Sequence, residues 1–103
     1  MPDLIVRPKV LVFIDTLESE AYSKVLRMLT LLNTYRYELR EPYTKKLTKN
    51  IYELRVRGKQ EVRLFYGYSN NDIIIVSAFI KKTQKVPQVE LDRAEREYAT
   101  LDI

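Results

Sequence analysis

Apolar residues in the first third of the chain recur at helical spacing. Between residues 19 and 35 the interval is three or four residues, which places these side chains on one face of a helix. They are Tyr22, Val25, Leu26, Leu29 and Leu32. Glu20 stands where a negative charge favours the first turn of such a helix. The pattern predicts an amphipathic helix over residues 19–35.

The preceding segment, residues 9–17, is ambiguous because its β-branched side chains favour a strand. Its apolar positions nevertheless follow the helical interval, and Pro8 suits the first turn of a helix. These positions are Val10, Phe13, Ile14 and Leu17. We predict a helix over residues 9–17, which leaves residues 3–7 for a short N-terminal strand.

The second half of the chain alternates apolar and polar positions instead. Residues 51–56 (IYELRV) place apolar and charged side chains on opposite faces of a strand. The turn RGKQ, in which Gly58 supplies conformational freedom, leads to a second strand at residues 61–68. The turn SNND then leads to the apolar segment 73–82. The pattern predicts a three-stranded antiparallel meander with a central, buried third strand.

A last helix is predicted over residues 89–101, because Leu91, Ala94, Tyr98 and Leu101 recur at helical spacing and Pro87 suits its start. With 103 residues, the chain is expected to form one domain over residues 1–103. The predicted fold class is α+β. It consists of the meander and the short N-terminal strand, two N-terminal helices on one face of the sheet, and a C-terminal helix.

The amino-acid composition excludes several kinds of catalytic and binding chemistry. The chain has no cysteine and no histidine, so disulfide, thiolate and imidazole chemistry are excluded, and no metal site or cofactor is expected. Its apolar runs are too short to span a bilayer, and its N-terminal stretch lacks the pattern of a signal peptide. We therefore expect a cytoplasmic protein without a membrane partner.

Charge is distributed unevenly around the net value of +4. Residues 45–63 hold seven cations and two acids, and residues 81–87 add three lysines. Residues 88–103 hold five acids and two arginines. Clustered cations suggest a polyanionic partner, although lysines are also common on any solvated surface.

Strand alternation brings part of this positive charge together. It places Arg55, Arg57 and Arg63 opposite the apolar side chains of their strands, so they would share an open sheet face. Lys81 and Lys82 end the neighbouring strand, and alternation alone does not decide which of them faces the arginines. Three more lysines precede the first strand of the meander: Lys45, Lys46 and Lys49. We predict a groove of phosphate dimensions on this face.

Four segments resemble, in order, the motifs of RelE/HigB-type toxins, in particular their phage-related branch. They are FIDTL, REPYTKKLTKNIYELRV, EVRLFY and FIKKTQKVPQVELDRA, and together they cover most of the chain. The resemblance implies a compact sheet with packed helices and a toxin of a type II toxin–antitoxin system that cuts messenger RNA on the ribosome. It also implies an antitoxin with a helix-turn-helix domain, through which alone the toxin would reach operator DNA.

The groove suits cleavage of RNA by its own 2′-hydroxyl, because arginine side chains bind phosphate oxygens and stabilise developing charge. The expected catalytic residues are Arg55, Arg63, Lys82 and Lys81. Lys82 is the preferred proton acceptor, ahead of Lys81 and of Glu53 and Glu61. Alternatively, much of the rate enhancement would come from positioning of the RNA by the ribosome. The residues expected to bind RNA are Lys45, Lys46, Lys49, Arg57, Lys59, Tyr66 and Lys85. Tyr66 has a second interpretation, as a core tyrosine.

Two other functions remain open from the sequence. Toxins of the ParE type share this fold and inhibit DNA gyrase without cutting RNA, so the fold does not separate the two targets. A non-catalytic binding module is the other alternative. This alternative is considered because residues 83–90 contain neither the tyrosine nor the histidine that several members of the family carry after the last strand.

Overall fold

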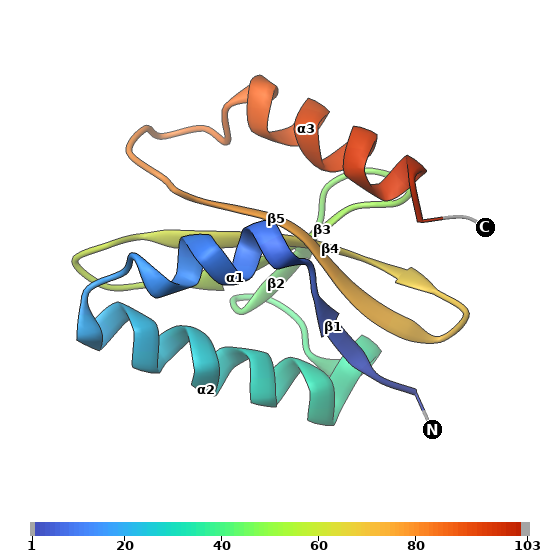
Figure 1. The fold of residues 1–103 in the computed structure, drawn as a ribbon, viewed down its shortest axis with the longest axis horizontal. Coiled ribbons are helices and arrows are strands. Elements are labelled where there is room, and N and C mark those ends of the chain that lie inside the picture. Colours follow the sequence, from blue (N-terminus) through green and yellow to red (C-terminus); the bar gives the residue numbers. More distant parts are fainter. Residues whose placement is uncertain (1, 102–103) are drawn as a thin grey trace.

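A computed structural model describes residues 2–101 as a five-stranded sheet with helices on both faces (Figure 1). The strand order across the sheet is β1-β5-β4-β3-β2. In chain order the elements are β1 (Leu4–Val6), α1 (Pro8–Asp15), α2 (Ser19–Tyr35), the 3₁₀ helix η1 (Arg36–Glu38), β2 (Thr44–Lys46), β3 (Tyr52–Val56), β4 (Val62–Ser69), β5 (Asp72–Ile80) and α3 (Gln88–Ala99). The predicted α+β class, the helices and the meander are confirmed.

The sheet is wider than the predicted meander by one strand. β2 has only three residues, Thr44–Lys46, and pairs antiparallel with β3 so that Lys46 lies opposite Tyr52. A strand this short and polar leaves no alternating pattern in the sequence, so it was not predicted. At the other edge, β1 pairs parallel with β5, which makes β5 a central strand as expected.

A bulge interrupts the pairing of β4 with β5. Phe65 lies opposite Ser77, whereas the next residue, Tyr66, lies opposite Ile75, so Val76 is an extra residue in β5. An extra residue reverses which face the following side chains occupy. Beyond the bulge, Phe79 therefore packs on the same side as Val76, although an uninterrupted strand would turn it away.

Two apolar clusters hold the helices to the sheet. The larger cluster lies between α1, α2 and one face of the sheet, and the smaller one lies between α3 and the opposite face. Figure 1 shows α3 on the other side of the strands from α1 and α2. The face that carries the predicted groove is therefore covered in part by α3. No helix within residues 2–101 is long and apolar enough to cross a membrane.

Gly67 allows α3 to approach β4 closely. A Cβ atom at this position would lie 2.4 Å from a ring carbon of Tyr98, nearer than side-chain atoms tolerate. The Tyr98 hydroxyl donates a hydrogen bond of 2.8 Å to the backbone oxygen of Tyr68. Tyr98 is thus fixed against the sheet as a packing residue.

Candidate functional site

A cationic groove of about 360 Å³ lies on the α3 side of the sheet, between β3, β4 and the segment that joins β5 to α3. Six cationic side chains and one carboxylate, that of Glu53, line it. The cations are Lys45, Arg55, Arg57, Arg63, Lys81 and Lys85. Each of these six was predicted as a site residue, and strand alternation accounts for three of them, Arg55, Arg57 and Arg63.

The Glu53 carboxylate lies at the centre of this cluster and is almost completely buried. Its Oε1 accepts a hydrogen bond of 3.0 Å from Arg55 Nε, and its Oε2 lies 3.3 Å from Arg63 Nε. The second contact is within ion-pair distance but is not aligned as a hydrogen bond. Since Arg55 and Arg63 are direct cross-strand partners, Glu53 compensates two like charges that would otherwise repel each other.

The three arginines differ strongly in exposure. The side chain of Arg63 is 5% exposed, that of Arg55 is 18% exposed and that of Arg57 is 61% exposed. Arg63 also donates a hydrogen bond of 3.0 Å to Glu61. The expectation that all three stand open on this face is therefore corrected for Arg63. It lies at the floor of the groove because two carboxylates hold it there.

Glu61 joins the exposed and the buried arginines. Its Oε1 lies 3.0 Å from Arg63 and 3.5 Å from Arg57, and its Oε2 accepts the Gly58 N–H. Partial burial acts to raise the pKa of Glu61, but the Gly58 N–H and the two guanidinium groups outweigh it and hold this pKa below its ordinary value. Glu61 therefore remains a carboxylate with little tendency to accept a proton.

Lys81, rather than Lys82, faces the groove. The bulge at Val76 explains this, because it reverses the faces of the residues that follow. Lys81 Nζ donates hydrogen bonds of 2.6 and 2.8 Å to the backbone oxygens of Thr83 and Gln84. Lys82 is exposed and does not line the groove. These two bonds fix the end of the Lys81 side chain against the segment that follows β5.

Four further predicted RNA-binding residues lie elsewhere. Lys46 is on the other side of β2, with Nζ 5.7 Å from the centre of the Tyr52 ring. Lys49 is exposed in the loop before β3, and Lys59 lines a separate hollow beside the start of α2. Tyr66 is buried in the core under α1 and α2, so its interpretation as a core tyrosine is the one that matches its position.

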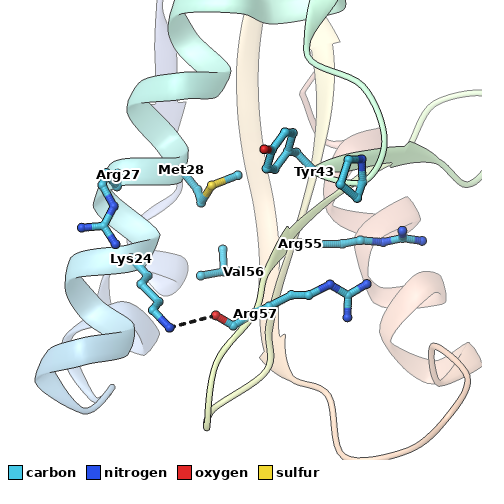
Figure 2. A pocket seen from close by; sticks show the side chains of 8 residues that line it. Lys24, Arg27, Met28, Tyr43, Arg55, Val56 and Arg57 are labelled. Carbon is cyan, nitrogen blue, oxygen red and sulfur yellow. Dashed lines mark hydrogen bonds between the residues drawn. The ribbon is translucent and has the colours of Figure 1, made fainter.

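Figure 2 shows the other side of the same part of β3. Arg55 and Arg57 point away from α2, while Met28 and Val56 face a separate pocket of about 260 Å³. Lys24 Nζ donates a hydrogen bond of 3.2 Å to the backbone oxygen of Arg57 and so ties α2 to the end of β3 (Figure 2). The arginine side chains thus project to the α3 side of the sheet, where the groove lies.

The buried tyrosines make stability sensitive to alkaline pH. Burial, together with the neighbouring tyrosines, raises the pKa of Tyr68 to about 12, and burial likewise raises the pKa of Tyr66. A raised pKa means that the folded state keeps a proton that the unfolded chain releases near pH 10. The contribution of these tyrosines to the free energy of unfolding should therefore be constant below about pH 10 and should fall as the pH rises towards about 12.

Urea unfolding at about pH 9 and about pH 11 measures this loss of stability. Tyr68→Phe removes one of the titrating hydroxyls and should make the loss smaller. An equal loss in the wild type and in Tyr68→Phe would contradict this explanation.

Three solved structures are similar to this chain. Archaeal RelE, in its complex with RelB from Pyrococcus horikoshii OT3, has a TM-score of 0.60 and 21% identity, covering 77% of this chain and 93% of that one. A free arginine-to-alanine double mutant of the E. coli toxin RelE has a TM-score of 0.65 and 13% identity, covering 99% and 98%. YoeB, in the YoeB-YefM toxin–antitoxin complex of Staphylococcus aureus, has a TM-score of 0.56 and 17% identity, covering 81% and 98%.

At these identities the structures establish the fold, which is that of RelE and YoeB. A comparison with curated protein sequences finds no significant match. A family model does match, over residues 12–99, and its description is "Phage derived protein Gp49-like (DUF891)". The resemblance to the phage-related branch of RelE/HigB-type toxins is thereby confirmed, and the chain belongs to the Gp49-like family of phage-derived proteins.

Proposed function

We propose that this protein is the toxin of a type II toxin–antitoxin pair and that it stops translation by cutting messenger RNA on the ribosome. The observation that carries the proposal is the groove, in which six cationic side chains surround a single buried carboxylate. Such a surface favours a polyanion strongly over a neutral or cationic ligand. The RelE-like fold and the family membership support the same conclusion.

Phosphate binding would be divided between fixed and mobile cations. Arg55 is held by Glu53 and is still partly exposed, so its guanidinium is preorganised for the scissile phosphate. Lys45 and Lys85 are exposed at the rim, and they make no ion pair within residues 2–101. We assign them to the flanking phosphates. Arg63 would act from the floor by fixing Glu53, and through it Arg55.

In the proposed reaction, the 2′-hydroxyl oxygen attacks the adjacent phosphorus and its proton is released. The bond from phosphorus to the 5′ oxygen breaks, and that oxygen receives a proton. The products are a 2′,3′-cyclic phosphate and a 5′-hydroxyl end. Guanidinium and ammonium groups in the groove would stabilise the charge that develops on the phosphate oxygens.

The residues considered as proton acceptors from the sequence are poorly placed for that role. Lys81 already donates two hydrogen bonds, Lys82 lies outside the groove, and Glu53 is held between two arginines. These positions favour the alternative of rate enhancement by positioning and charge stabilisation, with the ribosome bending the RNA into line. Water would then carry the proton away.

An antitoxin is part of the proposal, because a toxin of this kind must be silenced in the cell that makes it. The structures of archaeal RelE and of YoeB are of complexes with RelB and YefM, respectively. By analogy we propose an antitoxin with a helix-turn-helix domain, through which the complex would bind operator DNA. The location of the protein in the cytoplasm follows from the same proposal.

Expression in cells distinguishes the proposed nuclease from a gyrase inhibitor of the ParE type. Induction should arrest translation and produce cleaved messages, without double-strand breaks in DNA, because the cationic groove suits the phosphates of an RNA chain. Supercoiling by purified gyrase should be unaffected. If gyrase is inhibited while messages remain intact, the ParE-like alternative is correct.

A further inference from the structure

A cluster of four tyrosines lies at the β2 edge of the sheet, on the side of α1 and α2 and outside the groove. Tyr37 from η1 stacks on Tyr68 from β4, with ring centres 4.0 Å apart and planes 13° from parallel. Tyr52 and Tyr66 form a second stacked pair at 5.3 Å, and Tyr52 meets Tyr68 edge to face. The inner rings belong to the core, but Tyr37 lies at its outer end.

One face of the Tyr37 ring is open. The residue is 62% exposed even though its other face is covered by Tyr68. The preceding residue, Arg36, adopts a φ of 52°, which is uncommon for a residue other than glycine. The Arg36 guanidinium is itself held by Asn33 Oδ1 at 2.8 Å and by the backbone oxygen of Asn71 at 3.0 Å. The chain therefore holds a flat aromatic surface towards solvent at a strained position.

Positive charge surrounds this surface. A hollow of about 220 Å³ beside the tyrosines is lined by four cations, Arg36, Arg40, Lys45 and Lys46, and by one acid, Glu41. Lys45 lines both this hollow and the groove on the other side of the sheet. β2 thus forms a narrow cationic ridge between the groove and the tyrosine cluster.

We propose that this hollow is a second binding site for single-stranded RNA, in which a base stacks on the open face of Tyr37 and its phosphate binds Lys46 and Arg40. The inference rests on the proposed function, since it continues the path of the RNA strand from the groove across β2. A flat aromatic face beside clustered cations suits a nucleotide, because every base has a π-face and every linkage carries a negative charge.

Binding of an RNA that cannot be cut tests the site separately from catalysis. The probe is a fluorescent oligoribonucleotide with 2′-O-methyl groups throughout, so that no 2′-hydroxyl is free to attack. Tyr37→Leu should weaken its binding by about 5- to 100-fold, which corresponds to the loss of one base–aromatic stack. Tyr35→Leu is the matched control, because Tyr35 is also exposed but lines neither cationic site. It should bind like the wild type.

A second variant reports on stacking directly. The chain contains no tryptophan, so Tyr37→Trp introduces a single one whose fluorescence a stacked base would quench. In a series of oligoribonucleotides of increasing length, quenching should begin only when the RNA is long enough to extend from the groove across β2. Short oligoribonucleotides should bind without quenching.

The outcomes separate this inference from the proposed function. If Tyr37→Leu binds the long RNA as tightly as the wild type does, and Tyr37→Trp shows no quenching, the second site is refuted while RNA cleavage is unaffected. If Tyr37→Leu instead weakens only the co-purification of the proposed antitoxin, the hollow is a protein interface and the inference is overturned. If the wild type binds no RNA, the inference fails, whereas the proposed function is decided separately by the cleavage assay on programmed ribosomes.

Discussion

Replacing Arg63 by methionine is expected to lower the free energy of unfolding by about 3–5 kcal/mol. The Glu53 carboxylate is 2% exposed, and in the variant it would keep only the single hydrogen bond from Arg55. Burying a carboxylate with incomplete compensation is costly, whereas methionine fills much of the space of the arginine stem. Chemical denaturation followed by circular dichroism measures the change.

Arg57→Met is the matched control for this experiment. Arg57 forms an ion pair with Glu61, which also pairs with Arg63, but the side chain of Arg57 is 61% exposed. An exposed ion pair contributes little, so this variant should change the free energy of unfolding by less than about 1 kcal/mol. Equal losses in the two variants would mean that the buried network around Glu53 is not what stabilises this end of the sheet.

Arg55→Ala is expected to lower the rate of messenger RNA cleavage on programmed ribosomes by about 100-fold, because it removes a preorganised donor to the phosphate. It should also cost about 2 kcal/mol of stability through the lost bond to Glu53. Glu53 keeps its contact with Arg63, so the domain should stay folded at the assay temperature. Cleavage by equal amounts of folded protein is the quantity to compare.

Lys82→Ala provides the control for position. Lys82 is a cation next to a groove residue in sequence, but it is exposed and does not line the groove. We expect cleavage at the rate of the wild type. A large loss in Lys82→Ala together with a small loss in Arg55→Ala would place the reacting phosphate on the other side of β5.

Much of the fold follows from periodicity alone. The helical spacing before residue 35 predicts α1 and α2, although α1 ends at Asp15 and not at residue 17. The alternating segments predict β3, β4 and β5 to within two residues at each end. β2 is different, because three polar residues form a strand only when β3 offers its edge. Such a strand is a product of tertiary pairing, and no local pattern identifies it.

The candidate site, like the fold, could be predicted from the sequence only in part. Alternation correctly places Arg55, Arg57 and Arg63 on one face, but it does not say that Glu53, on the same face, neutralises two of them. That acid is visible in the motif YELR, and an acid among cations on one strand face indicates ion pairing. The choice of Lys81 over Lys82 could not be made, because the bulge at Val76 arises from the pairing of β4 with β5.

The most direct test of the account is to map RNA ends after incubating the purified protein with programmed ribosomes. The account predicts new 5′-hydroxyl ends in the messenger when ribosomes and wild-type protein are both present, and very few with Arg55→Ala. Messages that stay intact with folded wild-type protein, or ends that form equally with Arg55→Ala, would contradict the claim that the cationic groove cuts RNA.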